Sequence, residues 1–244
     1  MPRTHQEFML RGSSAPSGQS HQSHKLIINS AQCRVRIRNL SDAVLVVGLT
    51  GTFGSGKSTV GKLFGRCGAR KVINCDQIVH EAFRPGHPLR KRIDALFDSE
   101  KRLSRKQIAK KVFSNQTKRK RLEALIHPYV RKRVLEEMSR IQKGVVVVEA
   151  PLLFESHFDR LCDVTITVSA GRRNIIRRLA RKGFKPDEVC ARMNAQLSEL
   201  VKRRKADLVI LNFGSKELLV VKVKKVWTTL LSKHKQMMDK ELRQ

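Results

Sequence analysis

The sequence predicts an α/β fold in which a parallel β-sheet carries helices on both faces. Strand-like and helix-like segments alternate along most of the chain, which is the pattern of such sheets. The strand-like runs are continuously apolar, as in 145–148, and this indicates burial on both faces. A glycine-rich turn joins the first long strand to a helix. One all-helical block interrupts the alternation, and we expect it to be an inserted domain.

The elements follow from the same patterns, taken in chain order. Buried-type strands are expected at 43–49, 71–74, 145–149, 163–169 and 207–211. Helices are expected at 57–66, 77–83, 104–113, 116–142 and 216–234. Two further helices are expected, one before and one after 183–186. Pro128 falls inside the longest of these helices, where we expect it to introduce a kink.

The chain divides into an extension, one domain and a short tail. Residues 1–42 are rich in Ser, Gln, Arg and His and contain only two acidic residues, so we expect a flexible basic extension. It could be a mitochondrial transit peptide, an artificial leader, or the result of a start codon assigned too early. The domain at 43–235 has a core (43–75, 144–171, 205–235), a helical insert (76–143) and a helical lid (172–204). Residues 236–244 form a tail.

Composition limits the possible functions. The 244 residues include 51 Lys and Arg against 21 Asp and Glu, a net charge of +30, which implies an anionic partner. No apolar run approaches the roughly 20 residues that a membrane-spanning helix needs. Five cysteines without a C-x-x-C pair argue against a disulfide scaffold or a structural zinc site, and indicate a reducing, cytoplasmic location. Aromatic residues make up only 5%, which counts against a single-strand nucleic-acid binder.

The strongest motif is G-x-x-x-x-G-K-S at 51–58, placed between an apolar strand and a helix. Its glycines allow backbone N–H groups to converge on phosphate oxygens at the positive end of the helix. Lys57 is expected to reach the β- and γ-phosphates, and Ser58 to bind Mg²⁺. The alternative is an ordinary glycine-rich turn. The motif predicts ATP and Mg²⁺ as cofactors, bound by Gly51, Thr52, Phe53, Gly54, Ser55, Gly56, Lys57, Ser58 and Thr59.

Other features narrow the class of P-loop protein. The chain lacks the N-K-x-D guanine signature and is short for a helicase, so a small P-loop kinase fits best. Asp76 directly follows the second strand, at the sheet edge where ligands bind in open α/β sheets. Its carboxylate could take the proton of an acceptor hydroxyl. The alternative is that Asp76 caps the next helix.

Several runs resemble dephospho-CoA kinases, in the order of that family and over about residues 44–230. The resembling runs are VVGLTGTFGSGKSTV (46–60), NCDQIVHEAFRPGHP (74–88), RKQIAKKVFSN (105–115), IHPYVR (126–131), PLLFE (151–155), RLARKG (178–183), RMNAQ (192–196) and A-D followed by N-F-G-S (206–215). Two positions depart from the family. Asn74 stands where the family has the first Asp of D-x-D, which puts a second magnesium role at 74 in doubt. Ser104 stands where an Asp is frequent.

The resemblance implies transfer of the ATP γ-phosphoryl group to the ribose 3′-hydroxyl of dephospho-CoA. Asp76 would be the base, and His127 and Arg131 would face the acceptor, one turn apart on one helix face. The alternative for His127 is that it only packs near the kink at Pro128. Asn212 would contact the adenine, or only shape a turn.

Two sets of charged residues leave their roles open. Of the arginines between Arg172 and Arg192, the resemblance favours Arg181 and Arg192 as lid groups that bind the transferred phosphoryl; the alternative is a solvated helix face. Glu149 or Glu155 could replace the usual metal-binding Asp, although most of the PLLFE run is expected to be core.

Two rival functions remain at this stage. One is a different small-metabolite or nucleoside kinase. The other is a nucleic-acid-binding P-loop protein, because residues 84–143 alone carry 19 basic and six acidic residues. A phosphate-binding site does not need this much charge. The surplus charge predicts steering of polyanionic substrates or weak, sequence-independent nucleic-acid binding. The oligomeric state stays open at this stage.

Overall fold

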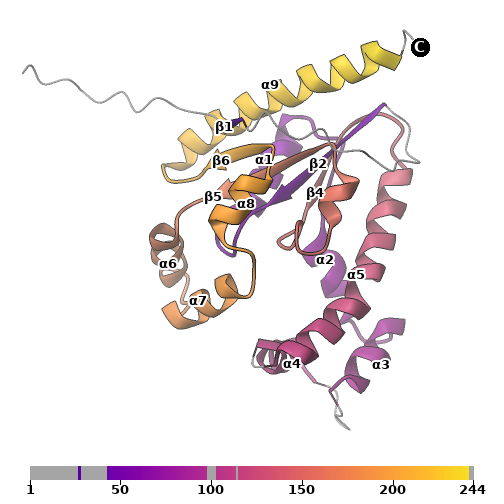
Figure 1. The fold of residues 1–244 in the computed structure, drawn as a ribbon, viewed down its shortest axis with the longest axis vertical. Coiled ribbons are helices and arrows are strands. Elements are labelled where there is room, and N and C mark those ends of the chain that lie inside the picture. The colour runs from indigo at the N-terminus through magenta and orange to yellow at the C-terminus, as the bar shows by residue number, and fades with distance from the viewer. Residues whose placement is uncertain (1–26, 29–42, 98–102, 114, 242–244) are drawn as a thin grey trace, which may run out of the picture.

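A computed structural model describes residues 27–28, 43–97, 103–113 and 115–241, and its architecture is the predicted α/β fold (Figure 1). Five parallel strands form the sheet: β2 (Val44–Thr50), β3 (Lys71–Asn74), β4 (Gly144–Glu149), β5 (Val164–Ser169) and β6 (Leu208–Leu211). Their spatial order is β6-β5-β2-β4-β3, so β2 is central. Each observed strand boundary lies within one residue of its prediction.

A sixth strand, β1 (Ile27–Ile28), was not predicted. It pairs antiparallel with β6, placing Ile27 opposite Val209 and Ile28 opposite Leu208. These two residues belong to the predicted flexible extension. A two-residue strand leaves no sequence period to detect, and its pairing depends on a partner about 180 residues away in the chain. The rest of the extension lies outside the described residues.

Each predicted helix is present, with differences at its ends, but the helices at 88–95 and 199–205 and the short 3₁₀ helix at 158–161 were not individually predicted. Helix α5 runs through Pro128 without interruption and ends at Ser139 rather than at 142, while α9 continues to Glu241 rather than ending at 234. The helices are α1 (Lys57–Cys67), α2 (Cys75–Ala82), α3 (Pro88–Ala95), α4 (Arg105–Phe113), α5 (Gln116–Ser139), α6 (Arg172–Ala180), α7 (Pro186–Asn194), α8 (Glu199–Lys205) and α9 (Lys216–Glu241), with a short 3₁₀ helix η1 (Phe158–Leu161).

The alternating side chains of β2 divide the interior into two apolar cores. Val44 and Val46 face a core that includes residues of α2, α5 and η1, whereas Leu45, Val47 and Leu49 face one that includes residues of α1 and α9. All five of these side chains are fully buried. Helices therefore cover both faces of the sheet, as its continuous apolar strands require.

The insert and the lid project from the same edge of the sheet. Helix α2 follows the carboxyl end of β3 and α6 follows that of β5, so both blocks leave the edge where parallel strands end. Figure 1 shows α3, α4 and the first half of α5 below the sheet on one side, and α6 and α7 on the other. The lid has a small core of its own, in which Ile175, Leu179, Val189 and Met193 pack with Phe53 of the glycine-rich loop.

Because Leu45 is fully buried on the central strand, we expect Leu45→Ala to lower the free energy of unfolding by about 2–5 kcal/mol. Val221→Ala is the control, since Val221 is 61% exposed on α9, and should change it by less than about 0.5 kcal/mol. Urea titration followed by circular dichroism measures both. Similar losses for the two variants would contradict the assignment of the core.

Candidate active site

The loop between β2 and α1 has the geometry of a phosphate cradle. Gly54 and Gly56 have φ angles of 77° and 98°, values that side-chain-bearing residues avoid, and Gly56 is the N-cap of α1. A Cβ atom on Gly56 would clash with Nδ2 of Asn212, and one on Gly54 would lie 2.7 Å from Leu179 of α6. Only glycine fits at these positions, because Asn212 after β6 and Leu179 of the lid lie directly against the loop.

Asn212 supports this loop directly. It is 8% exposed, and its Nδ2 donates a hydrogen bond of 2.8 Å to the carbonyl oxygen of Ser55. Neither interpretation from the sequence, adenine contact or turn formation, included this bond. The adenine contact stays a prediction, with the amide nitrogen of Asn212 already engaged by the loop.

A short hydrogen-bonded chain joins the first residues of α1 to the ends of β4 and β3. Ser58 Oγ donates to Glu149 Oε1 at 2.6 Å, and Asn74 Nδ2 donates to Glu149 Oε2 at 3.4 Å. Glu149 is 2% exposed at the end of β4. Of the two carboxylates considered from the sequence, it is therefore Glu149, and not Glu155, that lies beside Ser58.

Asn74 also rules out one of the two interpretations of Asp76, the cap of the helix that follows. The Oδ1 atom of Asn74 accepts from the backbone N–H of Gln77 at 3.2 Å, so Asn74 is the N-cap of α2. Asp76 lies within the first turn, and the interpretation of Asp76 as the helix cap is wrong. Its exposed side chain lines the cavity described next.

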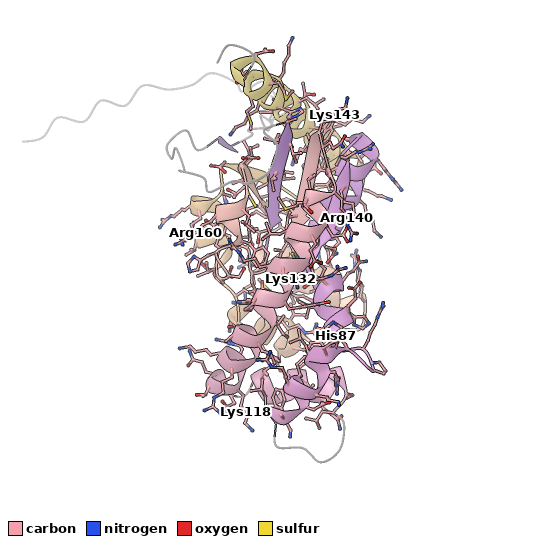
Figure 2. The ribbon with its side chains drawn as sticks, turned by 90° about the vertical axis from the view of Figure 1, so that its right-hand side faces the viewer. His87, Lys118, Lys132, Arg140, Lys143 and Arg160 are labelled. Carbon is pink, nitrogen blue, oxygen red and sulfur yellow. The ribbon has the colours of Figure 1, made fainter. Side chains whose placement is uncertain are left out.

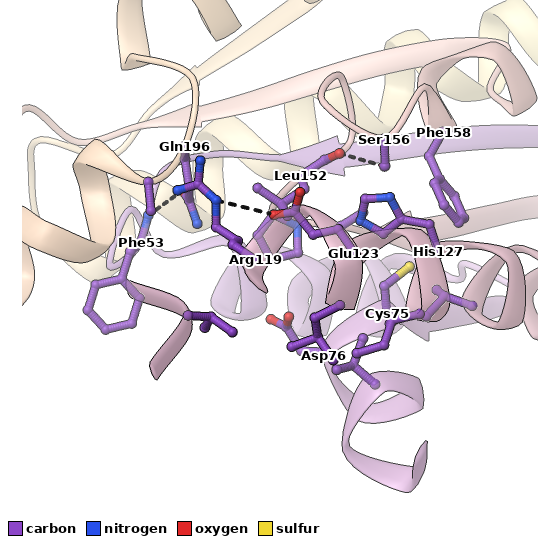
Figure 3. A pocket seen from close by; sticks show the side chains of 18 of the residues that line it. Phe53, Cys75, Asp76, Arg119, Glu123, His127, Leu152, Ser156, Phe158 and Gln196 are labelled. Carbon is purple, nitrogen blue, oxygen red and sulfur yellow. Dashed lines mark hydrogen bonds and ion pairs between the residues drawn. The ribbon is translucent and has the colours of Figure 1, made fainter. Parts of the chain in front are cut away.

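One cavity of about 520 Å³ brings together the loop, the insert and the lid (Figure 3). Its polar lining includes Lys57, Asp76, His127, Arg192 and Gln196. The insert contributes an apolar wall to the same cavity, formed by Val79, Val112, Leu122, Ile126 and Val130. A cavity of this size suits a ligand with both charged and apolar parts.

The structure brings His127 to the cavity but not Arg131. Arg131 is exposed and does not line the cavity, because the row of cavity-lining residues 119, 123 and 127 along α5 ends at His127, one turn before it. Burial lowers the pKa of His127, and the carboxylate of Glu123 one turn earlier partly opposes this. Glu123 itself lies 3.8 Å from Arg119, another lining residue.

Of the two lid arginines favoured by the sequence, the structure brings only Arg192 to the cavity. Its guanidinium stacks 4.8 Å from the ring of Phe53 and 5.5 Å from that of Phe184, and it pairs with Glu188 at 2.7 Å. Arg181 is exposed at the C-cap of α6 and does not line the cavity.

Gln196, which follows α7, connects the lid to the phosphate loop. Its Oε1 accepts from the backbone N–H of Phe53 at 3.2 Å. The stacking of Arg192 on Phe53 adds a second contact between the same two parts of the chain. The lid thus holds the phosphate loop on one side.

A buried ion pair that the sequence analysis missed joins the lid to the sheet. Lys202 on α8 is fully buried, and its Nζ lies 2.8 Å from Glu155 Oε1 and 2.5 Å from the carbonyl oxygen of Pro151. The same Glu155 oxygen accepts from the backbone N–H of Leu197 at 2.8 Å. Burial lowers the pKa of Lys202, Glu155 opposes this shift, and the nearby Lys57 adds to it. Within the run KRRK nothing in the sequence distinguishes Lys202 from its neighbours.

Comparison with known proteins identifies the family. A family model described as dephospho-CoA kinase matches residues 45–217. The chain belongs to the dephospho-CoA kinase family. The dephospho-CoA kinase of Thermobifida fusca is 38% identical over 194 residues, which cover 77% of this chain and 96% of that protein. A dephospho-CoA kinase of Thermus thermophilus is 38% identical over 174 residues, covering 71% of this chain and 85% of that protein.

Solved structures agree with this assignment. The crystal structure of TT1252 from Thermus thermophilus matches with a TM-score of 0.67 and 35% identity, covering 78% of this chain and 97% of that one. Dephospho-CoA kinase from Campylobacter jejuni matches with a TM-score of 0.53 and 27% identity, covering 76% and 96%. As a dephospho-CoA kinase, the chain is a phosphotransferase of the final step of CoA biosynthesis, with ATP as its phosphoryl donor. No helix in the described part of the chain is long and apolar enough to cross a membrane.

Lys202→Met should leave the Glu155 carboxylate, whose side chain is 20% exposed, without its cation and lower the free energy of unfolding by at most about 3–5 kcal/mol. Lys202→Arg keeps the charge and should retain most of the stability. The double variant Lys202→Met, Glu155→Leu removes both charges and should recover part of the loss, but it also removes the bond to Leu197. Urea unfolding measures stability; a Lys202→Met protein as stable as the wild type would contradict the pair's importance.

The depressed pKa of His127 gives stability a pH dependence. As pH falls below the ordinary value of 6.5, the unfolded chain takes up a proton more readily than the folded one, so stability falls until the folded-state pKa is passed. His127→Gln should make this loss shallower by at most about one proton per molecule. Glu123→Gln should extend the loss to lower pH, because it removes the opposing charge. Urea unfolding at about pH 5 to 8 tests this, and an unchanged profile for His127→Gln would contradict it.

Proposed function

We propose that this site transfers the γ-phosphoryl group of ATP to the ribose 3′-hydroxyl of dephospho-CoA, with Asp76 as the base. The observation that carries the proposal is the single cavity lined by Lys57 of the phosphate loop, Asp76 of α2 and His127 of α5. A donor phosphate and an acceptor hydroxyl can meet where these three elements converge. The apolar wall of the insert suits the uncharged part of dephospho-CoA.

On the donor side, residues Gly51 to Thr59 would bind the ATP phosphates through backbone N–H groups at the start of α1. Lys57 is 8% exposed and lines the cavity, so its ammonium group would meet the β- and γ-phosphates with little competition from water. Arg192 would add a second positive charge from the lid side. The roles of Arg181 and Arg131 stay predictions from the family resemblance, because neither residue lines the cavity.

The residues beside Ser58 suit a magnesium ion. Mg²⁺ prefers oxygen ligands, and the Ser58 hydroxyl and the Glu149 carboxylate are hydrogen-bonded to each other at the phosphate end of the loop. Ser58 would bind the ion directly and Glu149 would orient it, directly or through water. When bound, Mg²⁺ neutralises charge on the β- and γ-phosphates. Asn74 orients Glu149 without adding a charge of its own, in place of the family's Asp.

On the acceptor side, Asp76 would hold the ribose hydroxyl and take its proton. The hydroxyl oxygen forms a bond to the γ-phosphorus as the bond from that phosphorus to the bridging β–γ oxygen breaks, and ADP leaves. The hydroxyl proton moves to the Asp76 carboxylate. His127, on the facing helix, would orient the acceptor. The remaining rate enhancement comes from positioning and from positive charge around the transferred group.

A coupled ADP-release assay with dephospho-CoA tests the role of Asp76. Asp76→Ala should lower kcat by about 10²- to 10⁴-fold, because the proton acceptor is lost, while KM for ATP stays nearly unchanged. Asp76→Asn preserves the shape and should be equally slow. Lys57→Ala should abolish turnover through the donor side instead.

An undiminished kcat for Asp76→Ala would remove Asp76 from the mechanism. An acceptor series of dephospho-CoA, nucleosides and nucleoside monophosphates tests the acceptor separately, and faster turnover of a nucleoside would overturn the proposed acceptor.

A cytoplasmic location stays a prediction from the cysteine pattern.

A further inference from the structure

The surplus positive charge is concentrated on the helical insert. Residues 105–140, which span α4 and α5, include 12 basic residues and only three acidic ones. The phosphate-binding cavity uses one of these twelve, Arg119, in its lining. Most of the charge on the insert therefore serves no purpose in the site described above.

At 3.6 residues per turn, basic residues at 118, 121, 132 and 140 fall within about 100° of one another around α5 and its C-cap, and Lys143 follows just beyond. We call Lys118, Arg121, Lys132, Arg140 and Lys143 the basic ridge. Figure 2 shows four of them labelled on the same face of the molecule. None of the five lines the cavity, and all except the half-buried Lys118 are exposed.

Acidic neighbours neutralise the ridge only in part. Lys132 lies 4.0 Å from Glu136, and Arg140 lies 3.6 Å from Glu137, distances that give weak exposed ion pairs. Glu136 and Glu137 also pair with Arg133 and Lys71, so two carboxylates are shared among four cations. Among the described residues, no carboxylate lies within ion-pairing distance of Arg121 or Lys143.

The length of the ridge matches a specific kind of polyanion. From Lys118 to Arg140 the helix rises by about 33 Å, at about 1.5 Å per residue. One turn of a nucleic-acid duplex is about 34–36 Å long, so a duplex lying along α5 would offer phosphates to both ends and to the middle of the ridge.

The side chains around the ridge disfavour two other partners. A helix that lies on an anionic membrane needs exposed apolar side chains to insert, yet of the exposed large apolar residues only Leu135, at 37%, belongs to α5. Single strands bind by stacking bases on aromatic rings. The one aromatic side chain of α5, Tyr129, is half-buried and hydrogen-bonded to His87 at 3.1 Å.

We propose that the basic ridge binds the phosphate backbone of duplex nucleic acid without reading its sequence. Binding is electrostatic, so its affinity falls steeply with salt, by about 0.9 in the log–log slope for each phosphate contact. Because the ridge lies outside the cavity, a duplex and a nucleotide bind at the same time.

The test is fluorescence anisotropy with a labelled mixed-sequence DNA duplex of about 24 base pairs, at about 50 to 300 mM KCl. The variant Arg121→Gln, Lys132→Gln, Lys143→Gln should weaken binding at least about tenfold at the lowest salt and reduce the log–log slope by about 2 to 3. The control variant Lys224→Gln, Lys225→Gln, Lys235→Gln removes the same charge from exposed positions on α9 and should reduce the slope by less than about 1. Both variants should keep wild-type dephospho-CoA kinase activity, which verifies folding.

Four outcomes would overturn the proposal. They are equal effects of the two triple variants, tighter binding to single-stranded DNA of the same length, tighter binding to phosphatidylserine vesicles, and displacement of the duplex by a saturating non-hydrolysable ATP analogue. An RNA duplex run in parallel distinguishes which nucleic acid the ridge prefers.

Discussion

A loop that binds phosphate through its backbone N–H groups can use only some of them to hold its own shape. In this kinase the surrounding elements supply the support. Asn212 donates to the carbonyl of Ser55, and Gln196 accepts from the N–H of Phe53. The glycines at 54 and 56 let Leu179 and Asn212 approach from behind. The sheet, the lid and the helix α1 are thereby fixed relative to one loop.

Buried charges connect the same elements and set the local electrostatics. Glu149 joins the start of α1 to the end of β3, and Glu155 with Lys202 joins the lid to the segment after β4. Taking an ion pair out of water costs desolvation energy, and removing only one of its partners costs more because the other charge is left without compensation. Lys202 and Glu155 thereby connect α8 with the segment that follows β4.

The sequence was sufficient for the fold and for one side of the site. The predicted strand ends lie within one residue of the observed ones, because continuous apolar runs end at charged or turn-forming segments. The motif at 51–58 located the loop. Asp76 was predicted to lie at the site from its position after a strand, and His127 from the resemblance of the run 126–131 to the family, and both line the cavity. The prediction for Arg131 was not matched by a place in the cavity, because a shared helix face does not show how far along α5 the cavity extends. The pairing of Lys202 with Glu155 and the strand β1 were not predicted, because each depends on a partner that is distant in the chain.

The pairing of β1 with β6 has a consequence for the sheet as a whole. Without β1, β6 would present an unpaired row of backbone N–H and C=O groups, which is a template for strand exchange with another molecule. Ile27 and Ile28 occupy part of that edge. Pairing with these two residues therefore shortens the part of β6 that is open to another strand from Leu208–Leu211 to its last two residues.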